Sequence, residues 1–269
     1  VCANSLSAVH FDEYLEVTET YGVFFNSDQE EDDKIEECRT KISASVGEHL
    51  PVIELAAFLA IQSGYFAASK AWSDMSSREQ GFFLEALEVL DKFMPSASSG
   101  SGRTDALHFL TYLMVELYLS THAEEHRDKA IDKAKDLLSA GRTEAYHYLY
   151  KLNRSSSYEI ALEYLERGAA LHDPKSLSEL EEIYISGVMP IKWTDEKLSF
   201  WVIPEIKNHK KAFEINLKLS EVSFFAQNID QSSYHLLGIG TEQNIEVAKQ
   251  KHLAKVELIP LKDKHSRFL

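Results

Sequence analysis

The sequence predicts an all-α protein built as an α/α superhelix, a solenoid of antiparallel helix pairs. Apolar residues recur every three or four positions along most of the 269 residues, as between Phe82 and Phe93, and this spacing places them on one face of a helix. Glycine (11) and proline (6) are scarce, whereas a sandwich or barrel of short strands needs many tight turns. No segment alternates apolar and polar residues for long, which argues against strands.

Twelve helices follow from this spacing. They are expected at residues 7–20, 34–46, 51–62, 77–94, 104–120, 125–140, 143–151, 157–171, 174–186, 212–226, 230–238 and 244–258. Three of the starts fit a capping box, in which a hydroxyl and a carboxylate three residues later satisfy free amides: Ser76 with Glu79, Thr121 with Glu124, and Ser156 with Glu159.

Other chain positions also mark helix ends. Asp173 followed by Pro174 is a start signal, because aspartate accepts from first-turn amides and proline loses no hydrogen bond there. Glycines follow several helical patterns, where they adopt a left-handed backbone most easily, at Gly141, Gly187 and Gly240. These signals favour short connections between helices.

Two regions are expected along the chain. The serine- and glycine-rich stretch 96–104 is predicted to separate an acidic N-terminal helical region, 1–95, from a helical repeat region, 103–269. Within the second region, residues 188–209 break the helical rhythm with two prolines and two tryptophans. We therefore predict an insertion near 188–209.

The second half contains a repeat of about one helix pair. The stretch 128–141 is similar to 158–172, with Ala130 and Ala161 lying 31 positions apart, and a third copy runs from 238 to 254. Such a unit cannot bury its apolar face alone and must stack on its neighbours. Residues 105–258 thereby resemble the Sel-one-like repeat family, relatives of the tetratricopeptide repeats. The resemblance rests on these matches and on the pairs Lys129-Ala130, Ala169-Ala170, Tyr184 with Gly187, and Gly238 with Gly240.

The resemblance implies a curved superhelix whose concave face binds peptides or proteins. Family members act as adaptors, as pathogen effectors, or as immunity proteins that neutralise secreted toxins. We therefore expect a non-catalytic protein–protein interaction module, a bacterial immunity protein or adaptor. A secreted effector and a structural or oligomeric scaffold are the alternatives.

The tetratricopeptide analogy places partner contacts on the first helix of each pair. It puts forward Tyr112, Glu116, Tyr146, Tyr150, Glu181 and Tyr184. The insertion adds Trp193 and Trp201, whose large rings suit a protein interface. The alternative is that these tyrosines belong to the helical core and that the tryptophans cover one of its edges.

Charge restricts the class of partner. The net charge of −15 argues against a protein that follows a nucleic acid backbone or an anionic membrane surface, since both need clustered Lys and Arg. Residues 1–95 hold 18 acidic and 6 basic side chains. We expect the most acidic run to steer a basic partner, such as a basic toxin, or else to be a solvated loop and helix start. Its candidate steering residues are Asp28, Glu30, Glu31, Asp32 and Asp33.

A zinc hydrolase is the catalytic alternative. His122 and His126 fit a His-x-x-Glu-His pattern, which would place two imidazoles one helical turn apart. No third ligand follows, and glutamates are favoured in any first helical turn. We therefore expect no catalytic residue, no bound metal and no cofactor.

The compartment stays open at this level. The two cysteines, Cys2 and Cys38, would form a disulfide in an oxidising compartment and need no explanation in the cytoplasm. The sequence begins without Met, which fits either a removed signal peptide, for a periplasmic or secreted protein, or a trimmed piece of a cytoplasmic one. No apolar stretch has the roughly 20 residues that a membrane-spanning helix needs.

Overall fold

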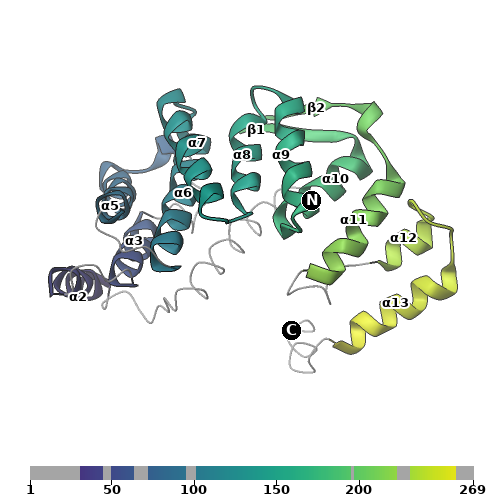
Figure 1. Cartoon of the computed structure of the whole chain (residues 1–269), viewed down its shortest axis with the longest axis horizontal. Coiled ribbons are helices and arrows are strands. Elements are labelled where there is room, and N and C mark those ends of the chain that lie inside the picture. Colours follow the sequence, from purple (N-terminus) through teal and green to yellow (C-terminus); the bar gives the residue numbers. More distant parts are fainter. Residues whose placement is uncertain are drawn as a thin grey trace. The chain divides into compact units, whose positions relative to one another are not determined.

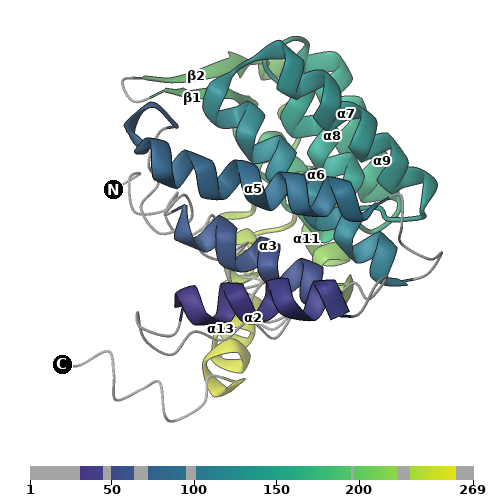
Figure 2. The same cartoon turned by 90° about the vertical axis from the view of Figure 1, so that its left-hand side faces the viewer.

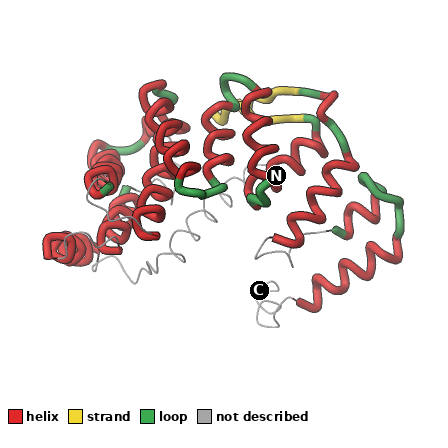
Figure 3. Tube along the Cα trace, viewed as in Figure 1, coloured by secondary structure: helices red, strands yellow, loops and turns green. Residues whose placement is uncertain are grey.

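A computed structural model describes residues 31–44, 50–63, 72–94, 101–194, 197–222 and 231–258. In these ranges the protein is all-α, with eleven α-helices, two short 3-10 helices and one two-stranded sheet (Figure 3). The predicted fold class is confirmed at this level. The chain forms two compact units, Val1–Gly141 and Arg142–Leu269.

The first unit is a stack of helices. Its elements are α2 (Glu31–Ala44), α3 (Leu50–Gln62), η2 (Trp72–Asp74), α5 (Ser77–Phe93), α6 (Ser101–Thr121) and α7 (Glu124–Ser139). Helix α3 packs against α2 and α5, as Figure 2 shows, and α6 packs against both α5 and α7. The predicted boundary near 96–104 therefore lies inside this unit, because α5 and α6 pack together on either side of it.

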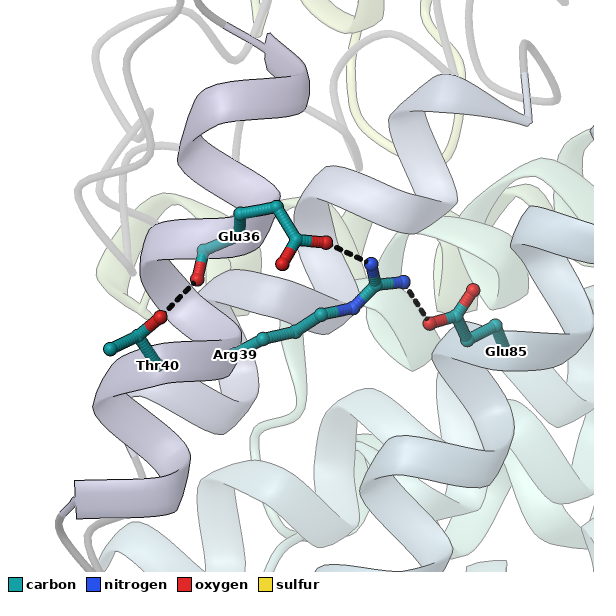
Figure 4. A network of polar contacts seen from close by, with 4 residues as sticks. All are labelled: Glu36, Arg39, Thr40 and Glu85. Atoms are coloured by element: carbon teal, nitrogen blue, oxygen red, sulfur yellow. Dashed lines mark hydrogen bonds and ion pairs between the residues drawn. The ribbon is translucent and has the colours of Figure 1, made fainter.

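A polar contact ties α2 to α5 in the first unit (Figure 4). The Arg39 guanidinium donates to the carboxylates of Glu36 and Glu85, at 2.5 Å each. The Thr40 hydroxyl donates to the Glu36 carbonyl at 2.8 Å. Arg39 thus spans two carboxylates, one on its own helix and one 46 residues away.

The second unit consists of helix pairs and one hairpin (Figure 1). Its elements are α8 (Ala145–Asn153), α9 (Tyr158–Ala170), α10 (Pro174–Ser186), β1 (Val188–Thr194), β2 (Lys197–Val202), η3 (Pro204–Ile206), α11 (His209–Val222), α12 (Ser232–Leu237) and α13 (Ile245–Leu258). Packed pairs are α8 with α9, α10 with α11, and α12 with α13, and α9 also packs on α10. Because only residues 154–157 and 171–173 connect α8, α9 and α10, these packed neighbours run antiparallel.

The second helices of these pairs begin alike. The side chains of Ser157, Asn208 and Asn244 each accept a hydrogen bond from the amide three residues later, at 3.3, 3.0 and 3.0 Å. Four residues after each cap stands a buried alanine, at Ala161, Ala212 and Ala248, whose amide donates to the capping residue's carbonyl. The copy at Ala212 was missed in the sequence, and it fills the long gap between the copies at 161 and 248.

Several helix starts and ends follow the expected chemistry. The capping box of Ser76 and Glu79 is present, and Asp173 caps α10. Two expected caps are wrong. Thr121 is the last residue of α6, where its hydroxyl donates to the Leu117 carbonyl, and the cap of α9 is Ser157, one residue later than expected. The predicted helix at 7–20 lies outside the described residues.

The region predicted as an insertion folds as a β-hairpin. Strands β1 and β2 pair antiparallel, with Val188 opposite Val202, Met189 opposite Trp201 and a bulge after Pro190. Two strands were not expected here, since proline interrupts the apolar pattern of the first. The hairpin is followed by η3, and α11 begins at His209, three residues before the expected start.

Candidate functional site

A polar cluster joins α8 to α10 in the second unit. We call it the α8–α10 junction and define it by His147, Tyr150, Lys151, Arg154 and Glu179. The first four are spaced three or four positions apart, or adjacent, so they share one side of α8 and its end. The Tyr150 hydroxyl donates to Glu179 Oε2 at 3.3 Å, and His147 Nε2 lies 3.7 Å from Glu179 Oε1. The Glu179 carboxylate of α10 therefore contacts both Tyr150 and His147 of α8.

Electrostatics keeps this carboxylate ionised. Burial alone would raise the pKa of Glu179, but the close contact with the His147 ring and the charges of His147, Arg154 and Lys151 outweigh it, so its pKa is lowered. Burial and the Glu179 charge raise the pKa of Tyr150. The contact of Tyr150 with the ionised Glu179 links α8 to α10.

Two further tyrosines make the same kind of contact. The Tyr184 hydroxyl of α10 donates to Glu166 of α9 at 2.9 Å, and the Tyr234 hydroxyl of α12 donates to Glu181 of α10. Burial and then these carboxylates raise the pKa of both tyrosines. Each first helix of the second unit thus contributes one buried tyrosine to a glutamate on another helix.

Four of the residues predicted to contact a partner lie in the interior. Tyr112, Glu116, Tyr150 and Tyr184 are all buried. Their helix faces pack against neighbouring helices, since α6 is covered by α5 and α7, and α10 by α9 and α11. Tyr112, Tyr150 and Tyr184 therefore lie in the helical core, which was the alternative interpretation of these tyrosines.

The other predicted contact residues are more exposed. Tyr146, Glu181 and Trp201 are partly exposed. The Trp201 indole donates to the Arg154 carbonyl at 2.9 Å and packs against Tyr158 with ring centroids 5.8 Å apart. The backbone of Trp193 pairs with Leu198 in the hairpin. A role of these residues in binding a partner stays a prediction.

The acidic run and the cysteines belong to the first unit. Asp28, Glu30 and Cys2 lie outside the described residues, and the backbone of Glu31, Asp32 and Asp33 forms the first turn of α2. Cys38 is a buried free thiol whose sulfur lies 3.9 Å from Glu54 Oε2. Burial raises the pKa of this thiol. Acidic steering and a disulfide stay predictions.

The two histidines of the zinc alternative do not share a helix. His122 has a φ of 53° in the turn between α6 and α7, and His126 lies in the first turn of α7. His126 Nδ1 is 2.9 Å from the Thr121 hydroxyl. The expected spacing of one helical turn is therefore wrong, because α6 continues to Thr121. In the described ranges no group of three His, Cys, Asp or Glu side chains could hold a metal ion.

Sequence reasoning missed two sets of residues. The contact of His147 with Glu179 joins positions 32 apart, which the pattern of a single helix does not reveal. The hairpin places two exposed apolar side chains, Phe200 and Val202, on β2. The β-branched and aromatic residues of 198–202 were the available signal for this strand.

No family model matches this chain, and no curated protein matches it. The resemblance to Sel-one-like repeats stays a prediction. None of the described helices is long and apolar enough to span a membrane.

Proposed function

We propose that the protein is a non-catalytic interaction module that binds another protein through its helix pairs. The observation that carries this proposal is the common start of α9, α11 and α13, each with a capping side chain and a buried alanine four residues later. Helix pairs repeated in register present side chains at regular intervals over a broad surface, which suits recognition of a protein or peptide.

The chemistry of the α8–α10 junction supports this function. The pKa of Glu179 is lowered, which keeps its carboxylate ionised, and the pKa of Tyr150 is raised, which keeps its hydroxyl protonated. A proton-transfer pair would need values near the working pH. We assign these groups to fixing α8 against α10, and thus to the shape of the binding module.

The role that fits best is an immunity protein or adaptor that engages a basic partner. The acidic excess of residues 1–95 supports this choice, because a field of one sign attracts the opposite charge over several ångströms. Association should be fast at low salt and should slow as salt screens the charges.

Co-purification from the source organism tests the proposal. The tagged chain should recover a protein partner in a stoichiometric complex, and the association rate should fall with rising salt. A variant in which Glu36 and Glu37 are replaced by Gln should associate more slowly. A matched control with the same two changes at Glu214 and Glu221, on the exposed surface of α11, should not. Recovery of the chain alone, under every salt condition, would contradict a protein-binding function.

A further inference from the structure

The hairpin leaves one backbone edge open on β2. The Ile203 amide donates to the Gly187 carbonyl at 2.8 Å, which makes these two residues a hydrogen-bonded pair. In an antiparallel ladder such pairs alternate, so Trp201 points its backbone groups toward β1. Phe200 and Val202 therefore point their amides and carbonyls away from β1. Among the described residues, the sheet has no third strand to accept them.

The side chains of this edge are apolar and exposed. Alternate residues of a strand lie on opposite faces, so Phe200 and Val202 share the face opposite Trp201. Trp201 is anchored on the α8–α9 connection, whereas Phe200 is 44% exposed and Val202 is 70% exposed. The same two residues thus combine free backbone groups with accessible apolar side chains.

A basic segment begins beside the Val202 end of the edge. Residues 207–211 contain Lys207, His209, Lys210 and Lys211, all exposed and with no acidic residue among them, in a chain of net charge −15. The β-carbon of Lys207 lies against Gly187, 3.3 Å from where a β-carbon of that glycine would stand. Gly187 precedes Val188, the partner of Val202. The lysines therefore follow the open edge along the chain, after the exposed Glu205 that lies between Val202 and Lys207.

We propose that the open edge of β2 is a docking site for an extended segment of a partner protein. Its apolar residues would stand at alternate positions beside Phe200 and Val202, and its acidic residues would continue past Lys207. Main-chain hydrogen bonds give such strand addition its affinity, and the side chains give specificity. This inference rests on the proposed function, because it names a surface through which the protein partner binds. The docking segment is a short acidic stretch of that partner, separate from the basic surface that residues 1–95 attract.

A synthetic probe tests the site on the full chain. The probe is a fluorescent peptide of alternating valine and threonine followed by a run of glutamates, and binding is measured by fluorescence anisotropy. We expect saturable binding. The same peptide with lysines in place of the glutamates, or with N-methylated amides at every second residue, should bind about tenfold more weakly or not at all. Equal binding of all three peptides would overturn the proposal.

Matched variants locate the contact. Val202→Glu and Lys207→Glu should each weaken binding of the acidic peptide by about tenfold, since both add negative charge beside it. Leu171→Glu is the control, because Leu171 is similarly exposed, at 53%, on the connection after α9. Unchanged melting temperatures would show that the variants are folded. An equal loss in the control, or no loss in the two edge variants, would overturn the proposal.

Two further outcomes bear on the class of ligand and on the proposed function. Binding to phosphatidylserine vesicles in place of the peptide would assign the edge to a lipid surface and overturn the proposal. A natural partner that co-purifies equally with wild type and Val202→Glu, while the peptide fails to bind, would leave the proposed function standing and remove only this docking site. Failure of co-purification, with no binding of the peptide, would remove both.

Discussion

The hydroxyl of Tyr150 donates a hydrogen bond to the carboxylate of Glu179, 29 residues further along the chain. The two residues lie on α8 and α10, the first helices of successive pairs. Because Tyr150 is fully buried, its hydroxyl has no access to bulk water as a substitute partner. The contact therefore fixes one helix pair against the next.

Removing this hydroxyl should destabilise the second unit. Tyr150→Phe leaves Glu179 with one donor fewer. Because a hydrogen bond to a charged group is lost, the free energy of unfolding should fall by about 1.5–3 kcal/mol. Urea unfolding followed by circular dichroism measures it. Tyr164→Phe is the matched control, since Tyr164 is partly buried on α9 and makes no hydrogen bond to the described residues. Equal stability losses would show that the hydroxyl contact contributes nothing specific.

The same junction predicts a loss of stability in acid. The pKa of Glu179 is lower in the folded protein than in the unfolded chain, so its ionised form stabilises the fold. This contribution is present above the unfolded value of about 4.3 and disappears as the pH falls through the lower folded value. The difference in unfolding free energy between wild type and Glu179→Gln should therefore shrink below pH about 4.3.

A control separates this effect from general charge removal. Glu221→Gln removes the same charge at an exposed position of α11. The free energy of unfolding of Glu221→Gln should differ little from that of wild type at neutral pH. If the unfolding free energy of Glu179→Gln differs from that of wild type by no more than this, the ionised carboxylate is not stabilising. The same conclusion holds if the difference grows as the pH falls.

Gly168 should resist substitution. A β-carbon at this position would stand 2.2 Å from the Ser176 hydroxyl oxygen, 2.8 Å from its β-carbon and 3.0 Å from that of Tyr146. Overpacking of this kind costs about 1–3 kcal/mol, which outweighs the gain in helix propensity. We expect Gly168→Ala to lower the melting temperature and a second change, Ser176→Gly, to restore part of it.

Gly81 is the matched control for this prediction. It lies within α5 with no atom within 4 Å of an added β-carbon. Gly81→Ala should therefore stabilise the protein by about 0.5–1 kcal/mol, because alanine loses less conformational freedom in a helix. Calorimetry on both variants decides the matter. Stabilisation by Gly168→Ala would show that α9 and α10 do not approach as closely as described.

The repeated caps predict equal effects at equivalent positions. Asn208→Ala and Asn244→Ala each remove the acceptor of a first-turn amide and should cost about 0.5–2 kcal/mol. Asn208→Asp keeps an acceptor oxygen and should retain most of the stability. Chemical denaturation measures the three variants. An aspartate variant as unstable as the alanine variant would show that the cap does not act through its side-chain oxygen.

The helical part of the fold was readable from the sequence for a local reason. Apolar spacing and capping residues lie within one helix, so Ser76, Glu79 and Asp173 indicate starts without knowledge of their surroundings. The hairpin escaped because Pro190 interrupts the alternation of β1 and a bulge follows it. Residues 195–196, which separate the two strands in the sequence, also include no glycine or asparagine of the kind that marks a tight hairpin.

The polar contacts depended on distances along the chain that no local pattern contains. Tyr150 and Tyr184 are placed by helical spacing, but the acceptors of their hydroxyls are carboxylates supplied by other helices, Glu179 and Glu166. A tyrosine facing a neighbouring helix and one facing a partner protein have the same local sequence. For this reason the sequence could not show which of the predicted contact residues are buried in the core and which are exposed.

Trp201 has a consequence for the thermodynamics of association. Its indole is bonded to the end of α8 and its ring rests on Tyr158, so the strand that carries Phe200 and Val202 is already immobilised in the free protein. A peptide that binds this strand would lose its own conformational entropy, but the strand itself would lose little. Preorganisation of this kind lowers the cost of complex formation and favours a slow dissociation rate.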